Sequence, residues 1–213
     1  MSCKLAIEDL NLYYGDFHAL KSIHMEIQPN EITAFIGPSG CGKSTLLKSL
    51  NRMNDLVEGC RITGAVKLDG EDIYHGMDVN LLRKRIGMVF QEPEHQFAAS
   101  TVRDEVAIGP KSMGKTDEEA YSIADRLLER LNLSRFAKAN PFTLSGGEKR
   151  RLSVASMLAA APKVLVMDEP TFGQDFSTWN EMGKLIAAIY PECDPALFTI
   201  YKRCGDYIKS RIL

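Results

Sequence analysis

Apolar and polar residues alternate near the start of the chain, and this pattern predicts two half-buried strands. The apolar positions of the two runs are Leu10, Leu12 and Tyr14, and then Ile23, Met25 and Ile27. A period of two places one face of a strand on the core and the other in water. Gly15 and Asp16 lie between the runs, so we expect a turn there and an antiparallel layer. Gly59 and Gly64 are interpreted as the ends of a linker to a strand at residues 65–68 that returns to this layer.

Continuous apolar runs and helical periodicities fill the rest of the chain. The further strands predicted from apolar runs cover residues 32–36, 86–90, 163–167 and 197–201. The predicted helices cover residues 46–53, an insertion at about 100–139, then 145–161 and 179–189. Thr116 and Ser145 are each followed three residues later by a glutamate, which is the spacing of a capping box. We therefore expect an α/β fold with an N-terminal antiparallel β layer and a helical subdomain.

Composition and charge narrow the class of protein. The chain has 213 residues, 45% of them hydrophobic, and a formal net charge of −2. This size allows a substantial core, while the lack of a basic excess argues against non-specific binding to nucleic acid. Five cysteines form no C-x-x-C pair, which indicates a reducing cytosol. The most apolar stretch, residues 154–161, is too short to cross a bilayer, so we expect any link to a membrane to run through another subunit.

A glycine-rich loop between a predicted strand and a predicted helix is the central motif of the chain. It consists of Gly37, Pro38, Ser39, Gly40, Cys41, Gly42, Lys43, Ser44 and Thr45. Glycines let the backbone turn its N–H groups inward, where they and the helix N-terminus hold phosphate oxygens. In such a loop the lysine reaches the β and γ phosphates and the serine hydroxyl reaches Mg²⁺. The motif therefore predicts binding of a nucleoside triphosphate with Mg²⁺.

Polar residues follow two of the predicted buried strands. Asp168 and Glu169 come after the strand at 163–167; Asp168 is the expected Mg²⁺ partner, and Glu169 is placed to orient or deprotonate water. Gln91 follows the strand at 86–90, at the edge where open α/β sheets bind ligands. It either contacts Mg²⁺ or the attacking water, or is a solvated loop residue. His95 is interpreted as a solvated loop histidine, because no second ligand lies at metal spacing.

Two further features bear on nucleotide binding. Tyr14 directly precedes Gly15, where an exposed ring would stack on a nucleobase; a strand aromatic packed on the core is the alternative. Ser145, Gly146 and Gly147 open a predicted helix, and its first N–H groups form a second anion site.

In this order, the phosphate loop, Gln91, L-S-G-G-E at 144–148 and D-E-P-T at 168–171 resemble the nucleotide-binding subunit of an ATP-binding-cassette (ABC) transporter, with the P-loop NTPase fold. The likeness covers about residues 5–175. It implies that the ligand is ATP, that Tyr14 stacks on its base, and that Gln91 links catalysis to the membrane partner. It also implies that Asp168 holds magnesium and that Glu169 is the catalytic base, with Lys43 acting on the phosphates.

The resemblance also implies the assembly. Two such subunits, identical or different, would face each other head to tail on the cytoplasmic face of the membrane. The signature residues Ser145, Gly146 and Gly147 of one would then cap the γ-phosphate on the other, and Asp175 would contact the partner. A membrane permease would dock on the helical subdomain. We expect that subdomain at residues 92–145, between core segments 1–91 and 146–213.

The two halves of the chain resemble different relatives within this family. Residues 11–91, with NLYYGDFHALKSI and GPSGCGKSTLLKSLNRMNDL, resemble the phosphate-import ATPase. From Gln91 on, FQEPEHQFAASTVRDEVAIGP and NPFTLSGGEKRRLSVASML resemble the ATPases of energy-coupling-factor importers for vitamins and metal ions. Both solute classes therefore stay open.

The chain departs from the family pattern after its last predicted strand. The family has a histidine there that senses the γ-phosphate, but all histidines of this chain lie upstream of the signature motif, at His18, His24, His75 and His95. Two hypotheses follow: an ATPase that powers import, or a nucleotide-binding regulatory or assembly module with impaired hydrolysis. A chromosome-organising ATPase is disfavoured, because the chain has no long heptad insertion or basic cleft.

Overall fold

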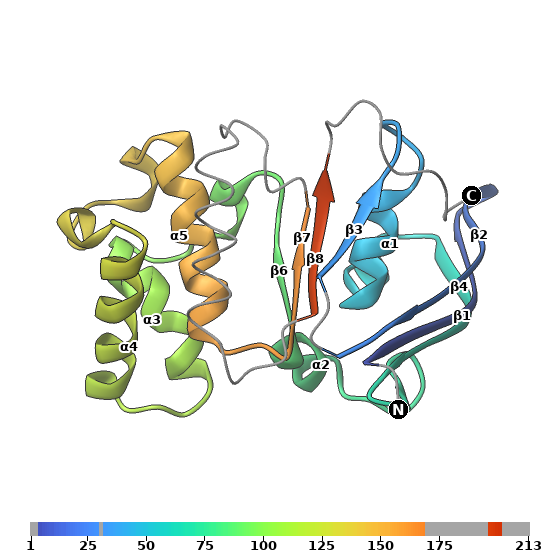
Figure 1. Ribbon diagram of the computed structural model, residues 1–213, viewed down its shortest axis with the longest axis horizontal. Helices are drawn as coiled ribbons and strands as arrows, with labels where there is room; N and C mark the ends of the chain where they lie inside the picture. Colours follow the sequence, from blue (N-terminus) through green and yellow to red (C-terminus); the bar gives the residue numbers. More distant parts are fainter. Residues whose placement is uncertain (1–3, 30–31, 169–195, 202–213) are drawn as a thin grey trace.

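Two sheets organise the computed structural model, which describes residues 4–29, 32–168 and 196–201 (Figure 1). The antiparallel sheet has the order β2-β1-β4-β5 and the parallel sheet the order β3-β8-β7-β6. The strands of the antiparallel sheet are β1 (Leu5–Tyr14), β2 (Phe17–Ile27), β4 (Cys60–Leu68) and β5 (Glu71–Asp72). The strands of the parallel sheet are β3 (Ile32–Ile36), β6 (Ile86–Val89), β7 (Val164–Met167) and β8 (Ala196–Tyr201).

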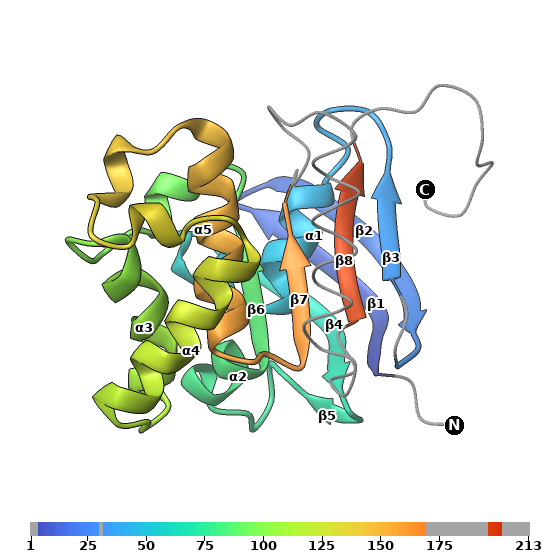
Figure 2. The ribbon, with the colours of Figure 1, turned by 60° about the vertical axis from the view of Figure 1, so that its left-hand side comes forward.

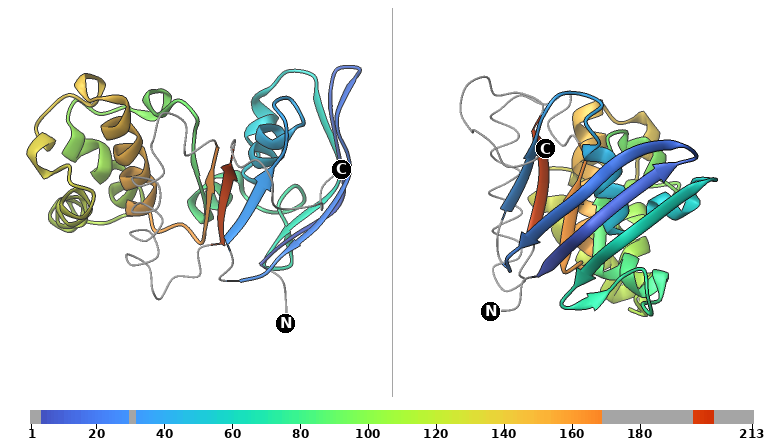
Figure 3. Two further views of the ribbon diagram at one scale, coloured as in Figure 1. Left: turned by 45° about the horizontal axis from the view of Figure 1, so that its top comes forward. Right: turned by 90° about the vertical axis from the view of Figure 1, so that its right-hand side faces the viewer.

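Helices cover both faces of the parallel sheet. The α-helices of the described segments are α1 (Lys43–Leu50), α2 (Val79–Arg85), α3 (Val102–Ser112), α4 (Asp117–Arg130) and α5 (Gly146–Ala159). Short 3-10 helices are η1 (Met53–Leu56), η2 (Pro93–Gln96), η3 (Ser134–Phe136) and η4 (Pro141–Thr143). Helix α1 lies between the two sheets, whereas α3, α4 and α5 gather beyond the other face of the parallel sheet (Figures 2 and 3).

The alternation of side chains along β7 divides the core in two. Val164 and Val166 belong to the cluster around α1, and Leu165 and Met167 belong to the cluster around α3, α4 and α5. All four are fully buried, as expected for a parallel strand covered on both faces. A residue at the carboxyl end of β7 therefore lies at the boundary between these two clusters of the core.

The sequence-based prediction of the α/β fold with an antiparallel layer and a helical part is confirmed. The hairpin of β1 and β2 turns at residues 15–16, and β4 returns to pair with β1. The capping boxes of α4 and α5 form as predicted, at Thr116 with Glu119 and at Ser145 with Glu148. The predicted helix at 179–189 lies outside the described residues. The division into subdomains at residues 91 and 146 stays a prediction.

One boundary was wrong: the segment expected as a linker is part of a strand. Strand β4 begins at Cys60 and passes through Gly64, which faces an irregularity in β1 at Asp9. Gly64 has a φ of +88°, and a Cβ at this position would lie 2.1 Å from the carbonyl oxygen of Asp9. The pairing of the strands therefore requires glycine here, where the sequence alone suggested a break.

Gly64→Ala is expected to destabilise the protein by at least about 3 kcal/mol, because a left-handed φ and a backbone clash act together. Gly70→Ala is the matched control. Its φ is +85°, but nothing lies within 4 Å of the added Cβ, so the left-handed φ alone should cost about 1 kcal/mol. Urea midpoints of the two variants measure the difference. Equal midpoints would contradict the close approach of β4 to Asp9.

Candidate functional site

The site lies at the carboxyl edge of the parallel sheet. Strand β3 leads into the glycine-rich loop, β6 leads into Gln91, and β7 leads into Asp168. Because β3 and β6 both run parallel to their neighbours in this sheet, the three segments emerge at the same edge (Figure 1). Ligands of open α/β sheets bind at this edge.

The loop turns into α1 through residues that only glycine fits. Gly40 and Gly42 have φ values of +82° and +94°. Gly42 is the N-cap of α1 and supplies no side-chain cap, so no capping side chain covers the N–H groups of the first helical turn. A Cβ on Gly42 would also lie 2.9 Å from Leu20 Cδ2. The arrangement leaves backbone donors at the loop, which suits phosphate oxygens.

Lys43 folds its ammonium back over the loop. Its Nζ donates to the carbonyl oxygen of Gly37 at 2.8 Å and to that of Pro38 at 2.7 Å. The same Nζ lies 3.4 Å from Cys41 Sγ. The positive charge is therefore fixed within the loop, at the place where the motif requires it to meet phosphate.

Ser44 and Asp168 are brought together from segments far apart in the chain. The Ser44 hydroxyl donates to Asp168 Oδ1 at 2.9 Å. Asp168 is only 3% exposed, and its backbone N–H donates to Val89 at 2.9 Å, which ties the ends of β7 and β6 together. A carboxylate and a hydroxyl are hard oxygen ligands, and Mg²⁺ takes one or two of them together with substrate phosphates. The residues present therefore fit Mg²⁺. The described residues contain no cluster of three or more His, Cys, Asp or Glu side chains that would cage another metal.

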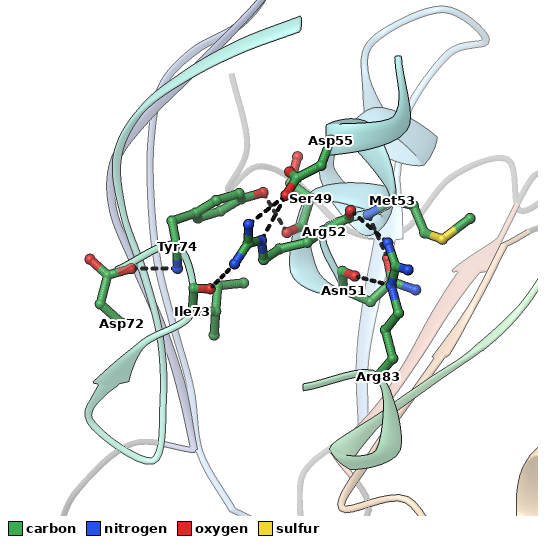
Figure 4. Close-up of polar contacts among 9 residues, drawn as sticks. All are labelled: Ser49, Asn51, Arg52, Met53, Asp55, Asp72, Ile73, Tyr74 and Arg83. Atoms are coloured by element: carbon green, nitrogen blue, oxygen red, sulfur yellow. Dashed lines mark hydrogen bonds and ion pairs between the residues drawn. The ribbon is translucent and has the colours of Figure 1, made fainter. Parts of the chain in front are cut away.

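Helix α1 is held from behind by a polar network at its C-terminal end (Figure 4). The Tyr74 hydroxyl donates to the carbonyl oxygen of Ser49 at 2.8 Å, and burial raises the pKa of Tyr74. Arg52 pairs with Asp55 at 2.7 Å and donates to the carbonyl oxygen of Ile73 at 3.2 Å. The last carbonyls of a helix have no partners within it, so this network satisfies one of them and anchors the element that begins with Lys43.

Tyr14 lies beside the loop, half-buried at the edge of the core. Its hydroxyl donates to Asn54 Oδ1 at 2.9 Å, and Asn54 Nδ2 donates to the carbonyl oxygen of Thr45 at 2.9 Å. Burial is the main reason why the pKa of Tyr14 is raised. The ring packs against the core cluster, and its stacking on a base stays a prediction.

The predicted second anion site, at the start of α5, lies beyond the other face of the parallel sheet from α1 (Figure 1). Ser145 caps α5: its N–H and hydroxyl donate to Glu148 Oε2 at 2.9 and 2.7 Å, and these bonds lower the pKa of Glu148. Ser145 and Gly146 are exposed. Helices α1 and α5 lie on opposite sides of the parallel sheet (Figure 1). This placement fits the prediction that Ser145, Gly146 and Gly147 act on a site in another subunit.

Of the remaining residues that the sequence singled out, the structure describes Gln91 and His95. Gln91 is exposed at the end of β6, and its role stays a prediction. His95 is also exposed and lies 3.1 Å from Glu92, in keeping with a solvated histidine. Glu169 and Asp175 lie outside the described residues.

Sequence reasoning missed one buried side chain at this edge. Arg150 is 2% exposed and donates to the carbonyl oxygens of Phe90 and Asp168. A signal was present, because Arg150 is spaced at i, i+4 and i+8 with Val154 and Leu158, which places it on the buried face of α5.

The chain is similar to a protein family and to individual proteins of that family. A model of the ABC transporter family matches residues 20–172. The phosphate import ATP-binding protein PstB of Mycolicibacterium smegmatis is 43% identical over 195 residues, which cover 89% of this chain and 75% of that protein. PstB 3 of Streptococcus pneumoniae is 47% identical over 179 residues, which cover 80% of this chain and 70% of that protein.

Solved structures agree with this fold. The structure of cbiO1 from Clostridium perfringens, described as part of the ABC transporter complex cbiONQ, matches with a TM-score of 0.79 and 32% identity, covering 96% of this chain and 80% of that one. A bacterial Atm1-family ABC exporter with ATP bound also has a TM-score of 0.79, at 24% identity, covering 93% of this chain and 34% of that one. The second likeness concerns the fold alone.

No helix in the described segments combines the length and the hydropathy needed to span a membrane.

Proposed function

The chain belongs to the ABC transporter family, and we propose that it is the ATP-hydrolysing subunit of an importer that takes up a small solute through a separate membrane permease. The contact of Ser44 with Asp168 at 2.9 Å, beside the loop that holds Lys43, is the observation that carries this proposal. It joins the phosphate loop to the carboxylate that follows β7, as Mg²⁺-dependent phosphoryl transfer requires.

Each residue at the sheet edge has a part in hydrolysis. Lys43 and the loop amides bind the β and γ phosphates through fixed donors, which stabilise the charge of the transition state. Ser44 and Asp168 would hold Mg²⁺, which when bound neutralises charge on the phosphate oxygens. Glu169 follows Asp168 in the chain and accepts the proton of the attacking water. Gln91, at the end of the neighbouring strand β6, orients that water and links hydrolysis to the permease.

The proposed assembly contains two ATPase subunits, of the same or of different chains. Helix α5 presents Ser145, Gly146 and Gly147 at an exposed N-terminus across the sheet from α1, so a second subunit is needed to bring a signature motif to the phosphate loop. Asp175 would contact that subunit. The permease would dock on the helical subdomain at residues 92–145, with the core formed by residues 1–91 and 146–213. This places the subunit peripherally, on the cytoplasmic face of the membrane.

Inorganic phosphate is the first candidate for the solute. Two relatives that are 43 and 47% identical carry the name of phosphate import ATP-binding proteins. A vitamin or metal ion is the second candidate, because the permease would dock on the second half of the chain. That half resembles the energy-coupling-factor ATPases, and a structural neighbour is described as part of a cbiONQ complex.

Co-purification from membranes tests the solute. The tagged full-length chain is extracted in mild detergent, and the proteins bound to it are identified by mass spectrometry. We expect a phosphate permease to accompany it, and Lys43→Ala, which keeps the docking surface, to retain the same partner. Recovery of an energy-coupling-factor permease would establish the second solute class instead. A chain that brings down no permease would contradict the transporter proposal.

The alternative of a regulatory or assembly module rests on one observation, the lack of a histidine anywhere after His95. Steady-state release of phosphate by the purified protein separates the two functions. We expect Mg²⁺-dependent release. A protein that binds ATP and dimerises, yet releases no phosphate, would favour the module.

A further inference from the structure

Two neighbouring side chains near the start of α5 form hydrogen bonds to the segment that contains Gln91. Lys149 donates to Glu94 Oε2 at 2.5 Å, and the Lys149 side chain is only 17% exposed. Arg150 donates through Nη1 to the carbonyl oxygen of Phe90 and through Nη2 to that of Asp168 at 3.4 Å. Gln91 therefore lies between two points, Phe90 and Glu94, at which α5 holds its segment.

The Arg150 contact is built into the core. A buried guanidinium is costly unless its N–H groups find acceptors, and the two carbonyls that accept from Arg150 stand directly after β6 and β7. Those strands are themselves joined there by the bond from the Asp168 N–H to Val89 at 2.9 Å. Arg150 thus fixes the start of the Gln91 segment relative to the carboxylate proposed to hold Mg²⁺.

The rest of the Gln91 segment is also tied down. Gln96 Nε2 donates to the carbonyl oxygen of Met88 at 2.7 Å, which closes the loop on β6. Phe97 is buried in the cluster of α3, α4 and α5. The bond from Lys149 is the main reason why the pKa of Glu94 is lowered, so this carboxylate is ionised and paired at neutral pH. The segment cannot shift without breaking its contacts to α5.

We propose that Lys149 and Arg150 are positioning residues that make the Gln91 segment and α5 move as one body, and thereby couple the two nucleotide sites of the dimer. The inference rests on the proposed dimer, in which Ser145 at the N-terminus of α5 acts on nucleotide held by the partner. Arg150 lies one turn further along and contacts the backbone of Asp168 in this subunit's own site. A rigid helix with contacts at both sites is a physical route for coupling between them.

Exchange of charges at the Lys149–Glu94 pair tests this proposal. Lys149→Glu and Glu94→Lys each bring like charges together, and the double variant restores opposite charges. Each single reversal is expected to lower kcat about fivefold. A factor of this size corresponds to the upper end of the interaction energies measured for partly exposed ion pairs. It should also lower the Hill coefficient for ATP from about two toward one, because two coupled sites set the upper limit. The double variant should recover both values.

The pair Lys67–Glu8, which joins β4 to β1 at 2.7 Å, is the matched control. Lys67→Glu and Glu8→Lys should lower the thermal midpoint slightly and leave kcat and the Hill coefficient unchanged. Thermal midpoints are measured for all variants. If a reversal unfolds at the assay temperature, Lys149→Gln and Glu94→Gln take its place and should show the same fall in the Hill coefficient.

Three results would overturn the coupling. These are single variants with unchanged kcat and Hill coefficient, losses that the double exchange does not recover, and equal losses in the control pair. A wild-type protein that binds ATP without releasing phosphate would instead contradict the proposed hydrolysis. The Hill coefficient of ATP binding to the same variants would then test the coupling independently.

Discussion

Lys43→Ala is expected to abolish ATP binding, with a rise in Kd of at least about 100-fold, because charge-assisted hydrogen bonds to two phosphates are lost. The side chain also holds the loop itself, through bonds of 2.8 and 2.7 Å to the carbonyl oxygens of Gly37 and Pro38. Alanine removes both the cation and this internal tie. Equilibrium titration of the purified protein with ATP and Mg²⁺ measures the effect.

Lys48→Ala is the matched control for this variant. Lys48 lies in the last turn of the same helix, so its loss removes an equal charge from α1 at the end away from the loop. We expect its ATP affinity to stay within about twofold of the wild type, a difference well below 1 kcal/mol. If both lysine variants lost affinity equally, a general loss of positive charge would explain the result, and the proposed role of Lys43 would fail.

The parts of the site that the sequence predicts are those whose chemistry is local. The phosphate loop needs glycines, a lysine and a serine at fixed spacing, and all of these stand next to one another in the chain. The capping box of α5 is equally local, because Ser145 and Glu148 share one helical turn. Burial on both faces also marks β7 without knowledge of its neighbours, since an uninterrupted apolar run is typical of a strand between two layers.

Features that depend on distant partners escaped prediction. Gly64 lies within β4 and comes close to the backbone of Asp9 at the irregularity in β1, and only the pairing of β4 with β1 reveals this. The spacing of Arg150 indicates the buried face of α5, but its partners, the carbonyl oxygens of Phe90 and Asp168, come from the ends of two strands and could not be predicted. The hydroxyl of Tyr14 likewise donates to Asn54, which lies far from it in the sequence. Such contacts are long-range hydrogen bonds, which no local periodicity encodes.

Glu169→Gln is expected to lower ATP turnover by about 10²- to 10⁴-fold while ATP affinity stays near that of the wild type. The size of the loss is that of general-base catalysis by a carboxylate. Glu169 directly follows Asp168 in the sequence, and Asp168 is the carboxylate that accepts the Ser44 hydroxyl at 2.9 Å. Glutamine has the same length but cannot take a proton from water. Steady-state phosphate release and an ATP titration, made on the same preparation, measure the two quantities.

Two comparisons make this result specific. Glu58→Gln changes an exposed glutamate before β4 and should leave both turnover and affinity unchanged. Asp168→Asn should instead weaken the dependence on Mg²⁺, because it removes the carboxylate proposed to hold the ion. If the base alone is missing, the ATP-bound form must accumulate, and light scattering should then show a dimer that persists in ATP and dissociates only slowly. A Glu169→Gln variant with wild-type turnover would assign the base to another residue, and one that had lost ATP affinity would make Glu169 a binding residue.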